Sequence, residues 1–203
     1  EETQIFGAIS MEPSLQNAIH QGMPVLIGLP GTHAKWAVVE NNTITDFRTF
    51  MTGELFDVLS RHSILGATMH PGDELHWDAF THGLTAAQEH HQTGLLSTLF
   101  STRSRLLTSN LTSSSQGDYL SGLLIGHELC GLASSLLRDL PATTPIALIG
   151  SANLNSRYSQ AFSHVFPDRQ IHAIPNATEQ GLWRIAHAAG LLSTNARECT
   201  HAI

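Results

Sequence analysis

The stretch LPGTHAKW, at residues 29–36, combines residue types that can hold an anion in a tight turn. Gly31 lets the backbone approach a ligand closely, Thr32 adds a hydroxyl, and Lys35 adds a positive charge. The spacing differs from the G-x-x-x-x-G-K-[ST] phosphate loop, and a lone glycine motif more often marks a plain hairpin corner. Taken alone, the stretch leaves a phosphate cradle and a hairpin corner both open.

A second stretch, ALIGSANL at residues 147–154, places Gly150 and Ser151 between a predicted strand and a predicted helix. Backbone N–H groups at such a junction, together with the helix N-terminus, are suited to a nucleotide. An ordinary strand-to-helix turn has the same residues. The motif therefore suggests a nucleotide site without requiring one.

A third stretch, EETQIFG at residues 1–7, supplies two adjacent carboxylates and an amide. A carboxylate placed beside an alcohol can accept its proton during group transfer. The alternative is the solvated acidic start of a helix, because most charged residues lie at the surface.

The 13 histidines do not predict a metal site. GHELCG at 126–131 lacks the second histidine of H-E-x-x-H, because position 131 is Gly131. MHPGDELHW at 69–77 and the pair His90–His91 match no familiar ligand spacing and include no cysteine. Within MHPGDELHW, the candidate metal ligands are His70, Asp73, Glu74 and His76. We expect surface or polar-core histidines, and a metal-binding protein stays a third-ranked alternative.

Composition excludes several classes of protein. Hydrophobic residues make up 41% and charged residues 13% of the chain, which is typical of a folded globular protein. The net charge is −7 with no basic run, so no nucleic-acid partner is expected. No apolar run approaches the roughly 20 residues that span a bilayer, so no membrane partner is expected. Cys130 and Cys199 are far apart in sequence, which favours reduced thiols and a cytoplasmic location.

Hydrophobic patterning predicts the elements that position these motifs. Residues 24–29, 35–40 and 43–50 read as three antiparallel strands, with an Asn-Asn turn between the last two. Thr52 is expected to cap a helix that follows at once, because apolar residues then recur at helical spacing. Residues 72–110 read as mostly helical, with a break at Gly94.

The second half of the chain predicts alternating helices and strands. A long helix is expected to run through Leu140 and to end at Pro141, with Ile125, Leu129, Leu132 and Leu136 on its apolar stripe. Strands are expected within 144–150 and at 170–174, each followed by a helix. The helix after the second strand is expected to open with a capping box at residues 176–179 and to place Leu182, Ile185, Ala186 and Ala189 on one face.

This order, βββα–(helical insertion)–βαβα, predicts an α/β fold with a ribonuclease-H-like mixed sheet. The insertion covers about residues 72–140. No internal repeat is found.

The order of these motifs resembles the 2-dehydro-3-deoxygalactonokinase family, sugar-acid kinases of the hexokinase–actin-like superfamily. Five segments carry the resemblance over nearly the whole chain: EETQIFGA, LPGTHAKW, FRTFMTGELFDVLSRHSIL, YLSGLLIG and ALIGSANLNSRY. The Asp-x-Gly-Thr-Thr phosphate loop of the family's other lobe is not found in these residues. The resemblance therefore implies an actin-like ATPase fold, in which residues 1–203 form a single C-terminal lobe and the N-terminal lobe is absent.

The resemblance also implies the roles of individual residues. Four residues would face the phosphates of ATP: Gly31, Thr32, His33 and Lys35. Three would lie beside the adenosine: Gly150, Ser151 and Asn153. Glu1, or else Glu2, would be the base in place of the aspartate of a Gly-Asp-Gln segment, and Gln4 would bind the substrate. Ala34 departs from the small hydroxyl residue expected there, which removes a side-chain contact but leaves the backbone cradle.

The implied activity is the ATP- and Mg²⁺-dependent phosphorylation of 2-dehydro-3-deoxy-D-galactonate to its 6-phosphate. Arg48 and Arg61 are candidates for the substrate carboxylate. The isolated residues 1–203 are expected to be inactive, because half of the phosphate clamp is missing. Two alternatives stay open: a kinase for another sugar or sugar acid, and a non-catalytic nucleotide- or sugar-binding sensor. The epimer accepted and the formation of a homo-oligomer are also left open.

Overall fold

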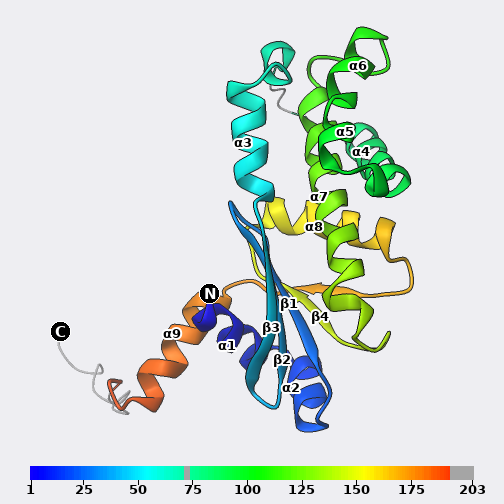
Figure 1. The fold of residues 1–203 in the computed structure, drawn as a ribbon. Helices are drawn as coiled ribbons and strands as arrows, with labels where there is room; N and C mark the ends of the chain where they lie inside the picture. The colour runs from blue at the N-terminus through cyan, green and yellow to red at the C-terminus, as the bar shows by residue number, and fades with distance from the viewer. Residues whose placement is uncertain (71–73, 193–203) are drawn as a thin grey trace, which may run out of the picture.

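The computed structural model describes residues 1–70 and 74–192, which fold around a five-stranded mixed sheet (Figure 1). The strands are β1 (Val25–Leu29), β2 (Ala34–Glu40), β3 (Thr43–Phe50), β4 (Ile146–Leu148) and β5 (Ile171–Ala173). Their order across the sheet is β3-β2-β1-β4-β5. The first three pair antiparallel, whereas β1, β4 and β5 run parallel. The predicted ribonuclease-H-like arrangement is confirmed.

Helices cover the sheet and extend beyond it. The helices are α1 (Glu2–Met11), α2 (Pro13–His20), α3 (Thr52–His62), α4 (Trp77–His90), α5 (Leu95–Leu99), α6 (Ser101–Leu107), α7 (Gln116–Ser134), α8 (Ala152–Val165) and α9 (Ala177–Ala188). Short 3₁₀ turns lie at Gly66–Thr68, His91–Thr93 and Leu136–Arg138. The helical segment predicted at about 72–140 is confirmed over its described residues, and Gly94, with φ 87°, breaks it as expected.

The sheet separates two apolar cores, because successive side chains of a strand point to opposite faces. On one face, Trp36 and Val38 of β2 pack with residues of α7 and α8. On the other, Ala37 and Val39 pack with α1 and α2. The fold is therefore three-layered at the sheet, with the α3–α7 helices projecting from one end (Figure 1).

Two turns of the sheet have different backbone requirements. Asn41 and Asn42 join β2 to β3 with φ of 49° and 62°, the left-handed pair that a tight hairpin needs. The β1–β2 turn is longer, because Leu29 pairs with Lys35 and leaves residues 30–34 at the corner. Since β4 runs parallel to β1, the end of β4 lies beside this corner.

Three predicted helix ends are wrong. The helix after β3 begins at Thr52, but Met51 holds the cap position and Thr52 instead bonds to another helix. The long helix α7 stops at Ser134, because Ser135 leaves helical geometry, with φ −116° and ψ −100°. Asn176 lies at the N-cap position of α9 with a left-handed backbone, and its side chain accepts no hydrogen bond from the first N–H groups of the helix. The predicted capping box is therefore not formed.

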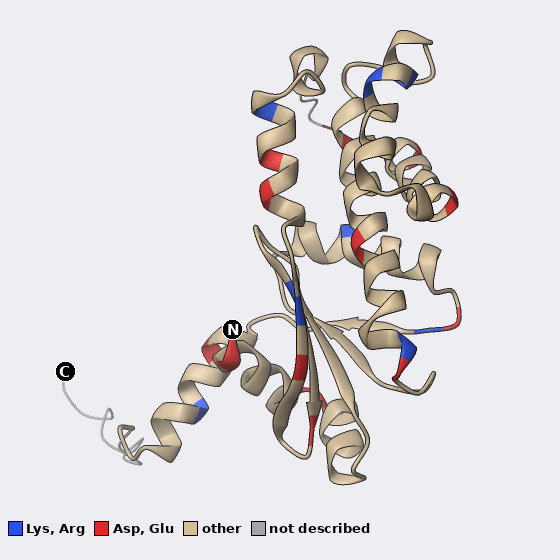
Figure 2. Ribbon diagram, in the orientation of Figure 1, with Lys and Arg blue, Asp and Glu red and all other residues tan. Residues whose placement is uncertain are grey.

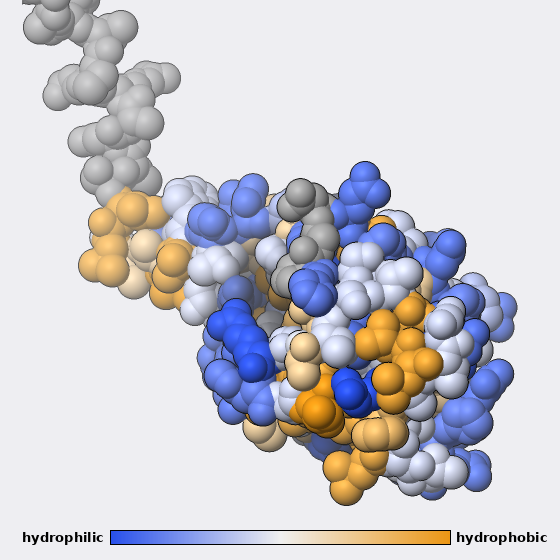
Figure 3. All heavy atoms as spheres, turned by 90° about the horizontal axis from the view of Figure 1, so that it is seen from above, coloured by the Kyte–Doolittle hydropathy of each residue, from blue (hydrophilic) through white to orange (hydrophobic). Residues whose placement is uncertain are grey.

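Apolar side chains at the outer end of the molecule are exposed. Leu182 and Ile185, predicted on one face of α9, are 57% and 46% exposed, as is Trp183 at 54%. Figure 3 shows apolar side chains gathered at the exposed end of this helix. Helix α9 packs on α1 through close backbone contact at Gly7 and Gly181, so its apolar stripe faces outward. No helix among the described residues has the length and hydropathy of a membrane span.

Candidate functional site

The β1–β2 corner, the start of α1 and the end of β4 surround a cavity of about 320 Å³. Seven predicted residues line it: Glu1, Gln4, Gly31, Thr32, His33, Lys35 and Gly150. Residues separated by up to 149 positions thus meet at one end of the sheet. The other three lining residues, Leu29, Pro30 and Ile149, have apolar side chains.

Glu1 and Lys35 form an ion pair at this cavity, with 2.9 Å between Oε1 and Nζ. The hydrogen bond from Lys35, with the charge of its ammonium group, holds the pKa of Glu1 below its usual value. Glu2 is 86% exposed and lines none of the cavities described here. The structure therefore places Glu1, and not Glu2, among the other candidate residues.

Gln4 lies one helical turn after Glu1 and is oriented by α9. Its Nε2 donates to the Thr178 hydroxyl over 3.0 Å. The helices cross closely here, since a Cβ at Gly181 would overlap the Thr3 carbonyl oxygen. A substituted glycine at this crossing would therefore shift α1 and the two site residues at its start.

The first turn of α3 supports the β1–β2 corner from the other side. The Glu54 N–H donates to the Thr32 carbonyl over 2.9 Å, and the Glu54 carboxylate contacts His33 Nε2. A Cβ at Gly53 would overlap the Gly31 carbonyl oxygen and lie 2.8 Å from Thr32 Cα. Only glycine at this position lets the helix sit directly against the corner.

The predicted adenosine residues lie at the start of α8 but are not equivalent. Gly150 packs against Pro30, and its carbonyl accepts from Asn155 Nδ2 over 3.0 Å. The Ser151 hydroxyl accepts from the Leu154 N–H over 3.4 Å, so it caps the helix and lines none of these cavities. Asn153 faces two further cavities.

Three neighbouring cavities share lining residues along this end of the molecule. Gly31 lines both the 320 Å³ cavity and one of about 250 Å³, which Asn153 and Arg157 also line. Asn153 and Arg157 in turn line a cavity of about 610 Å³ between α3 and the start of α7. Of these three cavities, the 610 Å³ cavity has neither Glu1 nor a corner residue in its lining. The 250 Å³ cavity shares residues with each of the other two and so lies between them.

A buried carboxylate between the sheet and the helices was missed as a candidate. Glu128 of α7 is 3% exposed and accepts hydrogen bonds from Trp36 Nε1 and the Tyr158 hydroxyl, both over 2.7 Å, and from the Thr52 hydroxyl. The sequence signal was its spacing, because Glu128 lies three residues after Ile125 and four before Leu132 on the buried stripe. A charged residue on such a stripe needs partners.

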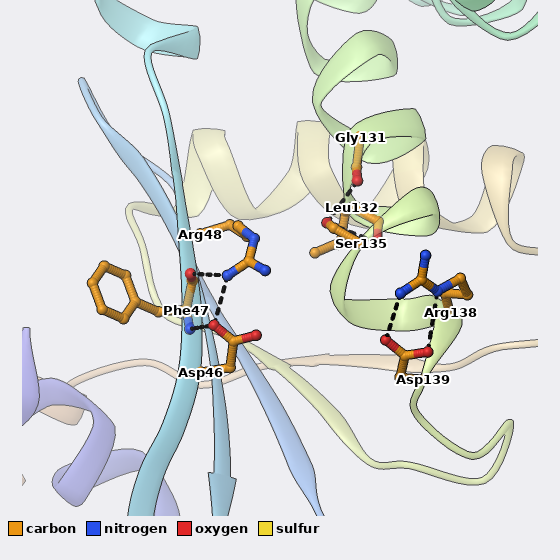
Figure 4. A network of polar contacts seen from close by, with 8 residues as sticks. All are labelled: Asp46, Phe47, Arg48, Gly131, Leu132, Ser135, Arg138 and Asp139. Carbon is orange, nitrogen blue, oxygen red and sulfur yellow. Dashed lines mark hydrogen bonds and ion pairs between the residues drawn. The ribbon is translucent and has the colours of Figure 1, made fainter.

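The structure separates the two arginines proposed for the substrate carboxylate. Arg48 lies on β3, paired with Asp46 at 2.6 Å and facing the C-terminal end of α7 (Figure 4). It lines none of the three cavities. Arg61 lines the 610 Å³ cavity and pairs with Asp57 at 2.8 Å. The structure therefore does not place Arg48 near Glu1.

The polar residues considered as metal ligands remain dispersed. Among residues 1–70 and 74–192, no group of three or more His, Cys, Asp or Glu side chains is placed to hold a metal ion. Asp73 and Cys199 lie outside the described residues, and Cys130 is a half-buried free thiol. Lys and Arg residues are spread over several elements (Figure 2).

Comparison with known proteins assigns the family. A model of the 2-keto-3-deoxy-galactonokinase family matches residues 1–185. The chain belongs to this family. It is 37% identical over 189 residues to the 2-dehydro-3-deoxygalactonokinase of Escherichia coli (strain K12), covering 93% of this chain and 59% of that protein. It is 32% identical over 193 residues to the probable 2-dehydro-3-deoxygalactonokinase DgoK1 of Rhizobium meliloti (strain 1021), covering 90% and 58%.

A solved structure supports the fold. A crystal structure from Sinorhizobium meliloti, described as a candidate 2-dehydro-3-deoxygalactonokinase, superposes with a TM-score of 0.79 at 29% identity. The superposition covers 94% of this chain and 60% of that one. The chain therefore spans about three fifths of the length of these relatives.

Proposed function

We propose that this chain is the ATP-binding lobe of a kinase that phosphorylates the terminal hydroxyl of 2-dehydro-3-deoxy-D-galactonate. Family membership and the names of the two curated relatives support this activity. The observation that carries the proposal is the convergence of Glu1, Gln4, the β1–β2 corner and Gly150 on one cavity. In this proposal the chain contributes one lobe to a longer protein that acts in the cytoplasm.

The β1–β2 corner would bind the phosphates of ATP, and the start of α8 would bind its adenosine. The backbone N–H groups at Gly31 and Thr32, with Lys35 Nζ, offer donors and positive charge to the terminal phosphates. Gly150 and Asn153 lie beside the adenosine, whose base extends toward the 250 Å³ cavity. Gln4 donates to a hydroxyl of the sugar acid.

Glu1 is the base of this reaction. Its carboxylate accepts the proton of the terminal hydroxyl while that oxygen bonds to the γ-phosphorus, and the bond from the γ-phosphorus to the β–γ bridging oxygen breaks to release ADP. Lys35 links the two halves of the site. When Lys35 turns from Glu1 to a phosphate, Glu1 loses the hydrogen bond that lowers its pKa and becomes a stronger base.

The residues present are compatible with Mg²⁺. Magnesium binds oxygen ligands, keeps several waters, and usually takes one or two carboxylates together with substrate phosphates. Glu54 contacts His33, which lines the cavity. The Glu54 carboxylate would hold the ion, directly or through water, together with the phosphates, which leaves Glu1 free as the base, and the bound ion would neutralise phosphate charge.

The activity is tested by an ATP-coupled assay of the complete protein across a panel of 2-keto-3-deoxy sugar acids and simple hexoses. We expect the largest kcat/KM for 2-dehydro-3-deoxy-D-galactonate, and the epimers in the panel define the stereochemistry. A larger kcat/KM for another sugar would assign a different substrate. Binding of sugar acid without any turnover of ATP would instead make the protein a sensor.

A further inference from the structure

Glu128 occupies a position that the proposed reaction does not use, between the sheet and the helical insertion. Its three donors come from three different elements: Trp36 from β2, Thr52 from α3 and Tyr158 from α8. All three donors are neutral. Among the described residues Glu128 has no cationic partner.

Such a group is costly to bury without a specific use. Burial is the main influence on the pKa of Glu128 and raises it, against the three hydrogen bonds that lower it. Burial and the nearby Glu128 carboxyl also raise the pKa of the Tyr158 hydroxyl, which therefore stays protonated and donates. An apolar residue would fill the same place in the core without this cost.

The contact to Thr52 leads directly to the β1–β2 corner. Thr52 is the first residue of α3, and the next two residues, Gly53 and Glu54, contact the corner. Gly53 packs on the backbone of Gly31 and Thr32, and the Glu54 N–H bonds to the Thr32 carbonyl. With no side-chain cap on α3, the Thr52 hydroxyl fixes its first turn to the core through Glu128.

We propose that Glu128 is a positioning residue for phosphoryl transfer, which sets the place of the phosphate-binding corner by holding Thr52 at the start of α3. This proposal rests on the proposed function of the corner. Trp36 and Tyr158 hold the carboxylate in place, and Thr52 transmits its position. Glu128 itself touches neither nucleotide nor sugar acid.

Paired substitutions in the complete protein test this role. Thr52→Val keeps the shape of the side chain and removes its donor, whereas Thr52→Ser keeps the donor. We expect Thr52→Val to raise the KM for ATP about tenfold, the loss typical of a hydrogen bond to a charged group, and to leave the KM for the sugar acid within about twofold. Thr52→Ser should restore the KM for ATP.

Trp36→Phe is the matched control, because it removes a buried donor to Glu128 but leaves the bond from Thr52 of α3 in place. We expect a lower midpoint of urea unfolding and a smaller rise in the KM for ATP than in Thr52→Val, because Tyr158 and Thr52 still hold the Glu128 carboxylate. If Trp36→Phe and Thr52→Val raise the KM for ATP equally, or if neither does, Glu128 is only a structural residue and the proposal is wrong.

Hydrogen exchange of the complete protein gives a readout that does not depend on catalysis. We expect amide exchange in a peptide covering residues 31–35 to be about tenfold faster in Thr52→Val than in wild type, and to rise less in Trp36→Phe. This result would support the positioning role even if the coupled assay failed to detect a kinase, which would overturn the proposed function alone. Equal protection of the peptide in all variants would overturn the positioning role.

Discussion

Lys35 and Trp36 are neighbours on β2 and meet a glutamate on opposite faces of the sheet. Lys35 pairs with Glu1, whose side chain is 51% exposed, in the candidate site. Trp36 donates to Glu128, which is buried and whose donors among the described residues are all neutral. The pKa of Glu1 is lowered and that of Glu128 is raised. The comparison teaches that one strand separates an exposed, ion-paired carboxylate, which we propose as the base, from a buried carboxylate that ties three elements together.

The largest expected effect is the loss of catalytic rate when the exposed carboxylate of Glu1 is removed. Glu1→Gln in the complete protein should lower kcat by about 10²–10⁴, the usual contribution of a general base, with little change in stability. Glu2→Gln is the matched control, and its kcat should stay within about threefold of wild type. Steady-state kinetics measure both. Equal losses from the two variants, or none from either, would remove the chemical role from Glu1.

Removing the buried carboxylate should act on stability instead. Glu128→Ala leaves three buried donors without an acceptor, and we expect the free energy of unfolding to fall by about 3 kcal/mol or more. Urea unfolding measures the change. Glu1→Ala should cost less than about 1 kcal/mol, because exposed ion pairs contribute little. If Glu1→Ala lowered the free energy of unfolding as much as Glu128→Ala, the two glutamates would not differ in their contribution to stability, and the comparison would be wrong.

The contact between the corner and α3 can be tested by adding one methyl group. Gly53→Ala should lower the free energy of unfolding by about 2 kcal/mol, because its Cβ would overlap backbone of the corner. Gly117→Ala in the first turn of α7 is the control, since a Cβ there would meet no atom of the described residues within 4 Å, apart from its chain neighbours and its own helix backbone. Alanine there should leave stability unchanged or raise it by up to about 1 kcal/mol. Thermal or urea unfolding of the pair decides, and equal losses would contradict the close contact at Gly53.

The smallest effect is a pair of pH dependences with opposite signs. The lowered pKa of Glu1 stabilises the fold above its unfolded pKa, and this contribution is lost as pH falls below about 4.5. The raised pKa of Glu128 has the opposite effect: wild type loses stability relative to Glu128→Gln as pH rises above about 4.5. Urea unfolding of wild type, Glu1→Gln and Glu128→Gln across pH measures both differences. The same sign for both would contradict the comparison.

Much of this fold could be predicted, because local patterns determine the strands. The three antiparallel strands and the later alternation of strands and helices were predicted from apolar runs and turn residues, and the structure confirms them. Helix ends were less predictable. Thr52 has the residue type of a cap, but a buried acceptor 76 positions away in sequence takes its hydroxyl.

The candidate site was predicted in part, through the family resemblance. The resemblance implied that Gly31 and Gly150 share one ATP site, and the structure brings both to one cavity because β1 and β4, which these residues follow, are parallel neighbours. The support from α3 could not be predicted, because Gly53 and Glu54 contact the corner only after the sheet and helices have packed. Glu128 was discarded with the incomplete H-E-x-x-H motif, although its place on an apolar stripe marked it as a buried group in need of partners.

The central claim is that the β1–β2 corner and Glu1 together receive phosphate and the reacting hydroxyl. The most direct measurement is a crystal structure of the complete protein with a non-hydrolysable ATP analogue and 2-dehydro-3-deoxy-D-galactonate. We expect the terminal phosphate within hydrogen-bonding distance of the Gly31 or Thr32 N–H, and the terminal hydroxyl of the sugar acid against the Glu1 carboxylate. A triphosphate bound away from this corner, or a terminal hydroxyl remote from Glu1, would contradict the account.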